Sequence, residues 1–138
     1  MKNTLNTLIT LVDYHRLLAR MNYVPSIDKL SVMEKELYIT LQSAKTISQH
    51  NVPKTVITIN STVRLQELLS QKEIELTITY PENANSQENK ISILSLIGIA
   101  LIGQQKGNQV SWKIPGGLGH FQIIDIPYQP EAAGDYSL

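Results

Sequence analysis

Three histidines carry the side chains best suited to proton transfer or metal binding near neutral pH: His15, His50 and His120. None of them has another histidine or a carboxylate at the spacing of a local metal motif. A titratable group also needs perturbing neighbours before it can act in catalysis. The sequence therefore predicts surface or partly packed histidines, with no metal site and no cofactor.

The glycines Gly116, Gly117 and Gly119 suggest a phosphate-binding loop at first sight. Such a loop continues into Gly-Lys-Ser or Gly-Lys-Thr and joins a strand to a helix. Here that continuation is missing and the flanking segments have the alternation of strands, so the glycines predict a hairpin turn. Local spacing brings no Ser, His and Asp together. The chain is not expected to be an enzyme.

Composition limits the class of protein and of partner. The chain has 138 residues, of which 42% are hydrophobic, which fits one globular domain or a domain with a small appendage. Lys plus Arg and Asp plus Glu are both 12, and no basic cluster stands out, which disfavours direct binding of nucleic acid and favours a protein partner. There are no cysteines and no membrane-length apolar run, so we expect a cytoplasmic protein without a membrane segment.

The elements that must position any site begin with helices over residues 13–48. Asp13 is a candidate N-cap, and apolar residues follow it at helical spacing: Tyr14, Leu17, Leu18 and Met21. Asn22-Tyr23-Val24-Pro25-Ser26 interrupts the pattern, and Ser26 is a candidate cap for the next helix. That helix has a narrow apolar stripe: Ile27, Leu30, Met33, Leu37, Leu41 and Ala44. The stripe fits either an antiparallel helical hairpin or an amphipathic helix packed on a sheet.

Strand patterns occupy most of the remaining chain. A short strand is expected within residues 1–12, and residues 55–128 read mostly as strands. Alternating or β-branched runs predict strands at 56–59, 62–65, 74–80, 110–114 and 121–128. The alternation slips between Ile123 and Ile124, which indicates a β-bulge or a strand covered on both faces. Between these strands, residues 96–102 are apolar enough to form a short buried helix.

The last third of the chain carries a family resemblance. Residues 91–103 read ISILSLIGIALIG, and Gly107-Asn108 and Pro115-Gly116-Gly117 follow. This order resembles the C-terminal domain of the bacterial Gre transcription factors, which reads roughly I-S-I-x-S-P-x-G-x-A-L-x-G, then G-D, then P-G-G. Residues 128–136 (YQPEAAGDY) resemble the tail of short Gre relatives that are described as regulators of nucleoside diphosphate kinase. Leu96 stands where proline is usual, and Asn108 replaces the common aspartate.

The resemblance implies an α+β fold in two parts. Residues 1–52 would hold the short strand and a short antiparallel helical hairpin, or coiled coil. Residues 53–138 would form the FKBP-like antiparallel sheet domain with one short helix, followed by the C-terminal tail. Residues 56–63 (VITINSTV) are similar to the V-V-T-M-N-S-x-V that opens this domain in the short relatives.

The resemblance also implies a partner. Gre factors dock on the rim of the secondary channel of bacterial RNA polymerase and help transcript cleavage with paired acids at the hairpin tip. The docking residues that carry over are Leu94, Ser95, Leu96, Ile97 and Gly98, and the tip residues are Tyr23, Val24, Pro25 and Asp28. Asp28 is the one acid near the tip, whereas a tightly held divalent cation needs paired carboxylates. It is either an ordinary helix-start carboxylate or a lone acid offered to the polymerase.

The resemblance thus implies a non-catalytic, polymerase-binding regulator of transcription elongation, with possible competition with Gre factors. Two alternatives remain open. The FKBP-like fold suggests a peptidyl-prolyl isomerase, although Trp112 and Phe121 are the only Trp and Phe available for an aromatic pocket. The short relatives suggest an effect on nucleoside diphosphate kinase, which no residue here tests.

Overall fold

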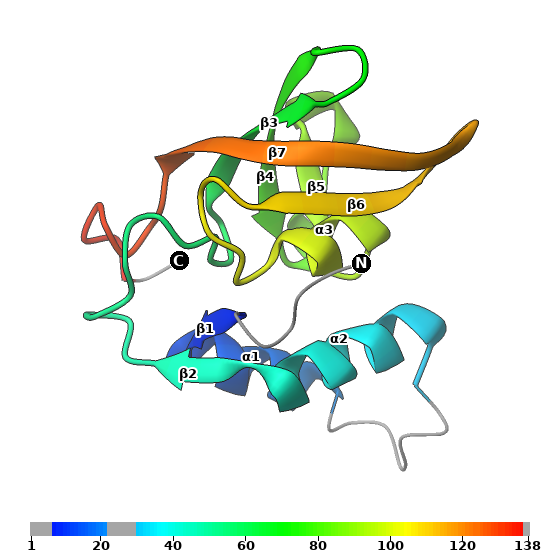
Figure 1. The fold of residues 1–138 in the computed structure, drawn as a ribbon. Helices are drawn as coiled ribbons and strands as arrows, with labels where there is room; N and C mark the ends of the chain where they lie inside the picture. Colours follow the sequence, from blue (N-terminus) through cyan, green and yellow to red (C-terminus); the bar gives the residue numbers. More distant parts are fainter. Residues whose placement is uncertain (1–6, 22–29, 137–138) are drawn as a thin grey trace.

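The computed structural model describes residues 7–21 and 30–136 (Figure 1). Within them, two N-terminal helices with two short strands precede a curled five-stranded sheet that has one short α-helix beside it. The helices are α1 (Leu11–Met21), α2 (Val32–Ser43) and α3 (Leu96–Leu101), with 3-10 helices η3 (Pro81–Asn83) and η4 (Ser86–Glu88). The strands are β1 (Leu8–Thr10), β2 (Lys45–Ile47), β3 (Thr62–Glu67), β4 (Glu73–Thr79), β5 (Lys90–Ser92), β6 (Gln109–Ile114) and β7 (Gly117–Tyr128). The predicted α+β class is confirmed.

Helices α1 and α2 start at hydroxyl caps that differ from the predicted ones. The N–H of Asp13 donates to the Thr10 hydroxyl at 3.1 Å, so Asp13 lies inside the first turn of α1. Helix α2 is capped by Ser31, which forms a capping box with Glu34. The prediction of a cap at Asp13 was therefore wrong, because the Thr10 hydroxyl takes that role. The predicted cap at Ser26 lies outside the described residues, and α2 itself begins after Ser31.

The apolar stripes of α1 and α2 face the core, as predicted. One hydrophobic cluster buries Leu17 and Met21 of α1 together with Leu37 and Leu41 of α2. The cluster also includes residues of the sheet part (the five-stranded sheet with α3 and the loops between them), such as Ile93. Helix α1 contacts α2, and α2 contacts α3. The helix pair (α1 and α2) thus packs within itself and also against the rest of the molecule, so each interpretation of the stripe accounts for part of it. The predicted turn between the helices lies outside the described residues.

The base of the helix pair is tied by a small parallel sheet. Strand β1 is the expected short N-terminal strand, and it pairs with β2, with Leu8 opposite Lys45 and Thr10 opposite Ile47. Residues 45–47 had been predicted to be helical. The helix ends sooner because Ala44 is extended, with φ −76° and ψ 150°, and the N–H of Lys45 donates to the Thr7 carbonyl at 3.0 Å.

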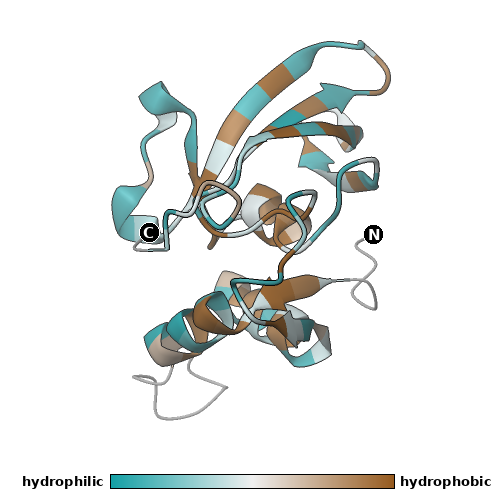
Figure 2. Cartoon of the chain, turned by 90° about the vertical axis from the view of Figure 1, so that its left-hand side faces the viewer, coloured by the Kyte–Doolittle hydropathy of each residue, from teal (hydrophilic) through white to brown (hydrophobic). Residues whose placement is uncertain are grey.

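The large sheet has the strand order β5-β4-β3-β7-β6. Figure 2 shows hydrophilic and hydrophobic residues alternating along its strands, and the hydrophobic helix α3. The predicted fully antiparallel sheet was wrong, because β5 runs parallel to β4, with Thr77 opposite Lys90. A parallel neighbour needs a connection that carries the chain back along the sheet, and the segment with η3 and η4 provides it. The predicted strands over residues 62–65, 74–80 and 110–114 correspond to β3, β4 and β6.

Strand β7 contains the irregularity that the apolar pattern indicated. Leu65 of β3 lies opposite Ile123, whereas its neighbour Arg64 lies opposite Asp125, so Ile124 is an extra residue and forms a bulge. At the other end of β7, Ile114 faces Gly117 across a two-residue turn. Gly116 in that turn has φ +92°, which explains its glycine. The glycine-rich segment is therefore the predicted hairpin.

Residues 56–59 are not the predicted strand. They form a buried central segment, the hub, in which only Val56 makes a β-bridge, to Gln105. The backbone of Ile57 bonds to Gln104 and Gly103 just after α3, and the N–H of Ile59 donates to the side chain of Asp13. The β-branched residues reflect burial on all sides, and the hub takes its hydrogen bonds from several elements instead of from one strand.

The C-terminal tail, residues 129–136, folds against the hub. The amide of Gln129 donates to the carbonyls of Pro53 and Val56 at 2.8 and 2.7 Å. The Thr58 hydroxyl donates to Glu131, and the centroid of the Tyr136 ring lies 4.5 Å from that of the His50 ring.

Across the described residues, no helix combines the length and the apolar character needed to cross a membrane.

Candidate docking surface

The segment between β5 and α3 forms a tight turn, the cap loop, residues 92–98. The Ser95 hydroxyl accepts the N–H of Gly98 at 3.0 Å and donates to the Ser92 carbonyl at 2.7 Å. This N-cap starts α3 and fixes the end of β5 against it. The N–H of Leu94 also donates to the Ser92 hydroxyl at 3.0 Å. The cap loop is thus a rigid, locally satisfied structure.

Rigid backbone presents apolar side chains on this surface. Leu96, at the first position of α3, is 51% exposed, whereas Leu94 and Ile97 are half-buried against the core. Gly98 is buried because α3 sits directly on β5. A Cβ at Gly98 would lie 2.4 Å from the Ser92 carbonyl oxygen and 2.9 Å from the Cα of Ile93. The five predicted docking residues are thus consecutive in one turn, in which Leu96 is the exposed apolar side chain and Gly98 is buried.

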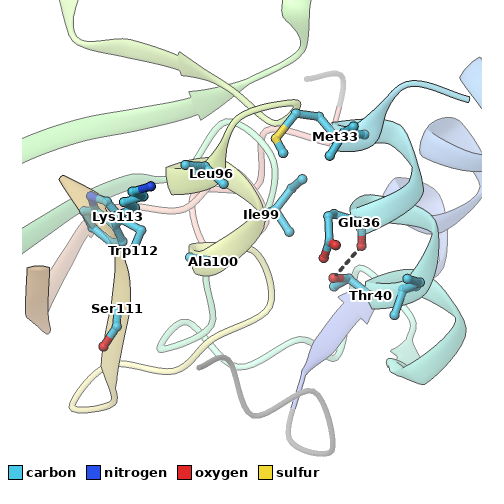
Figure 3. Close-up of a pocket in the computed structure, with 11 residues that line it drawn as sticks. Met33, Glu36, Thr40, Leu96, Ile99, Ala100, Ser111, Trp112 and Lys113 are labelled. Carbon is cyan, nitrogen blue, oxygen red and sulfur yellow. Dashed lines mark hydrogen bonds between the residues drawn. The ribbon is translucent and has the colours of Figure 1, made fainter. Parts of the chain in front are cut away.

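A groove of about 540 Å³ runs beside this patch, between α2 on one wall and α3 with β6 on the other (Figure 3). Exposed Val32 and Ile39 from α2 and Leu96 from α3 make it largely apolar. Glu36 and Lys113 place opposite charges on its two walls. The groove is lined by Val32, Met33, Glu36, Ile39, Thr40, Leu96, Ile99, Ala100, Ser111, Trp112 and Lys113. It suits an amphipathic protein segment better than a small charged substrate.

The predicted residues of the hairpin tip lie outside the described residues: Tyr23, Val24, Pro25 and Asp28. Among residues 7–21 and 30–136, no three His, Asp or Glu side chains gather in a way that could hold a metal ion.

One pair of chemically capable side chains was missed by the sequence reasoning. Ser111 and His120 lie opposite each other on β6 and β7, with 2.8 Å between Oγ and Nδ1. The hairpin register around Pro115-Gly116 was the signal that could have found them. The nearby Glu67 carboxylate accepts the N–H groups of Leu69 and Ser70. Because the Ser111–His120 pair lies at the surface, it lacks the water-excluded setting of a nucleophile and its base.

Residues 52–128 match the family model described as the C-terminal part of transcription elongation factors GreA and GreB. The chain belongs to the GreA/GreB family. The resemblance inferred from the sequence is thereby confirmed, and the matched residues include the hub, the cap loop and strands β3 to β7 of this Gre-family chain.

Individual relatives agree with the family model. The chain is 34% identical over 99 residues to the regulator of nucleoside diphosphate kinase of Escherichia coli (strain K12), covering 71% of this chain and 73% of that protein. It is 38% identical over 74 residues to the elongation factor GreA of Syntrophus aciditrophicus, covering 54% and 46%. A solved GreA/GreB elongation factor from Nitrosomonas europaea has a TM-score of 0.73 at 32% identity, covering 89% of this chain and 98% of that one. The helices and curled sheet are thus a Gre-type arrangement.

The aromatic residues count against an isomerase pocket in this Gre-family chain. Trp112 and Phe121 stack at 4.0 Å with an 8° angle between their rings, and each is 6% exposed. Phe121 therefore belongs to the core, and the groove holds Trp112 as its one aromatic side chain. Loss of turnover in a Phe121→Ala variant would report unfolding as readily as loss of an active site.

Replacing Ser95 with Ala is expected to destabilise the protein by about 1–2 kcal/mol, because the N-cap of α3 is lost. Urea unfolding followed by circular dichroism measures this cost. Ser31→Ala is the matched control, since it removes the cap of α2 and leaves the cap loop unchanged. A Ser95→Ala variant as stable as the wild type would contradict the role assigned to this hydroxyl.

Proposed function

We propose that this chain is a non-catalytic regulator of transcription that binds bacterial RNA polymerase at the rim of the secondary channel. The contact surface is the cap loop with the first turn of α3: Leu94, Ser95, Leu96, Ile97 and Gly98. The observation that carries the proposal is that the family match includes a rigid, capped turn which holds Leu96 half-exposed at the edge of an apolar groove. Such an exposed apolar patch is typical of protein contact sites.

The helix pair would then point towards the channel without supplying cleavage chemistry. Helices of 11 and 12 residues reach about 17–18 Å. Residues 22–26 contain no acid, and Asp28 is the one carboxylate in residues 22–29. The chain would therefore compete with Gre factors for the polymerase and fail to stimulate transcript cleavage, in the bacterial cytoplasm and without contacting nucleic acid through a basic face.

The test is binding of the full chain to bacterial core RNA polymerase, with GreA as competitor. Leu96→Ser is expected to weaken binding about tenfold, because an interfacial leucine side chain is lost, and to leave stability nearly unchanged. Leu69→Ser is the matched control, since Leu69 is 93% exposed in the turn between β3 and β4. Absence of binding, absence of competition by GreA, or equal effects of the two substitutions would contradict the proposal.

A second candidate function is an effect on nucleoside diphosphate kinase. It is favoured by the name of the Escherichia coli relative, the regulator of nucleoside diphosphate kinase, which is 34% identical. A direct effect requires that adding the purified chain changes the activity of the purified kinase. Unchanged kinase activity would count against it.

A further inference from the structure

Two carboxylates from distant parts of the chain are fastened to consecutive residues of the hub. The N–H of Ile59 donates to Oδ2 of Asp13 at 3.2 Å, and the hydroxyl of Thr58 donates to Oε1 of Glu131 at 2.7 Å. Asp13 belongs to α1 and Glu131 belongs to the tail. The helix pair and the tail therefore meet at adjacent residues of the hub through two acids, of which Asp13 is buried and Glu131 is partly buried.

Glu131 is joined to the hub through the Thr58 side chain, which also bonds to Ser61. The N–H of Thr58 donates to the Ser61 hydroxyl oxygen at 2.9 Å, and the two hydroxyl groups are 2.8 Å apart. The Thr58 hydroxyl donates to Oε1 of Glu131, so Ser61, Thr58 and Glu131 form one connected set of hydrogen bonds. Glu131 accepts in this set, and its hydrogen bond fastens the tail to the hub.

Asp13 is the partner whose charge can change near neutral pH. Its side chain is 3% exposed, and burial raises its pKa to about 7; the negative charge of Glu131 acts in the same direction. The Ile59 N–H, the Thr10 hydroxyl and the positive charge of Arg16 act in the opposite direction. Tyr80, which follows β4, also faces Asp13, and its own pKa is raised mainly by burial. Asp13 and Glu131 are therefore coupled by repulsion when both are ionised.

We propose that the tail is a proton-controlled latch, closed on the hub while Asp13 is neutral and loosened when Asp13 ionises. The tail yields before α1 does because of how each is held. Helix α1 is anchored by Leu17 and Met21 in the core. The tail turn is exposed at residues 132–134 and is held by the hydrogen bonds that Gln129 donates and Glu131 accepts. This device is independent of polymerase binding.

Hydrogen exchange of the tail amides in the full chain tests the latch. The N–H of Ala133 donates to the Gln129 carbonyl at 3.1 Å, and the N–H of Asp135 donates to that of Pro130 at 2.8 Å. Corrected for intrinsic exchange, their protection is expected to fall severalfold between about pH 6 and about pH 8. Asp13→Asn is expected to keep the protection high throughout. Protection that ignores pH in the wild type, or an undiminished fall in Asp13→Asn, would overturn the proposal.

The reciprocal experiment measures the same coupling from the tail and does not depend on folding of the Asp13 variant. Because coupling free energies are reciprocal, Glu131→Gln is expected to lower the pKa of Asp13, followed by NMR of its carboxyl carbon, by about half a unit. Glu75→Gln is the control, since Glu75 pairs with Arg64 on the sheet. An Asp13 pKa that is equal in Glu131→Gln and in the wild type would overturn the latch.

Discussion

The free energy of unfolding is expected to fall by about 3 kcal/mol between about pH 5 and about pH 8, and Asp13→Asn is expected to remove that fall. Burial of Asp13 raises its pKa from 3.8 to about 7. Between these two values the folded chain holds a proton that the unfolded chain has released. The stabilising contribution is thus complete below the unfolded pKa and is lost as the pH rises through the folded pKa.

Asparagine keeps an oxygen that can accept the Ile59 N–H but has no proton to lose in this range. The variant should therefore be more stable than the wild type at about pH 8 and similar to it at about pH 4. Urea unfolding at several pH values measures this. Asp125→Asn is the control, because hydrogen bonding to the Ile126 N–H and pairing with Lys106 lower the pKa of Asp125, which places its titration in more acidic solution. A wild-type slope retained in Asp13→Asn would refute the prediction.

Gly98→Ala is expected to cost about 3 kcal/mol or more and to abolish the proposed polymerase binding along with the order of the cap loop. In an open helix the same change would gain about 1 kcal/mol of helix propensity. Here the new Cβ would meet backbone atoms of Ser92 and Ile93 at 2.4 and 2.9 Å, and backbone cannot rotate away. The clash therefore outweighs the gain in propensity.

Thermal and urea unfolding of Gly98→Ala measure this cost. Gly107→Ala is the control, because Gly107 has φ +94° but open space around its Cα, so that only the backbone preference is lost, at about 1 kcal/mol. Equal costs in the two variants would show that close packing of α3 on β5 is not what requires glycine at position 98. The close approach of the Ser92 and Ile93 backbone to Gly98 explains the glycine of the I-S-I-x-S-P-x-G pattern.

Elements with a regular apolar period were predictable from the sequence. The alternation around Leu76 in β4, the phase slip at Ile124 and the inward stripe of α2 all reflect a local pattern that burial on one face imposes. The Gre-type pattern likewise located the cap loop around Ser95, since its residues are consecutive.

The features that were missed depend on partners far away in the chain. Residues 56–59 have strand composition, but their hydrogen-bond partners include Gln104, Gly103, Asp13 and Gln129, which no local pattern reveals. Asp13 was read as a cap because its contact with Ile59 spans 46 residues. Short parallel pairings such as β1 with β2 are too brief to leave a period. Tertiary contacts override local preference at these places.

The parallel pairing of β1 with β2 has a consequence for how this fold can diversify. It closes residues 8–47 into a loop whose two ends are paired with each other at the base of the helix pair. Adding one helical turn to both α1 and α2 would lengthen the pair by about 5.4 Å. The entropic cost of closing the longer loop would rise only with the logarithm of its length. The reach of the helices can therefore be adjusted by paired insertions without redesign of the sheet part.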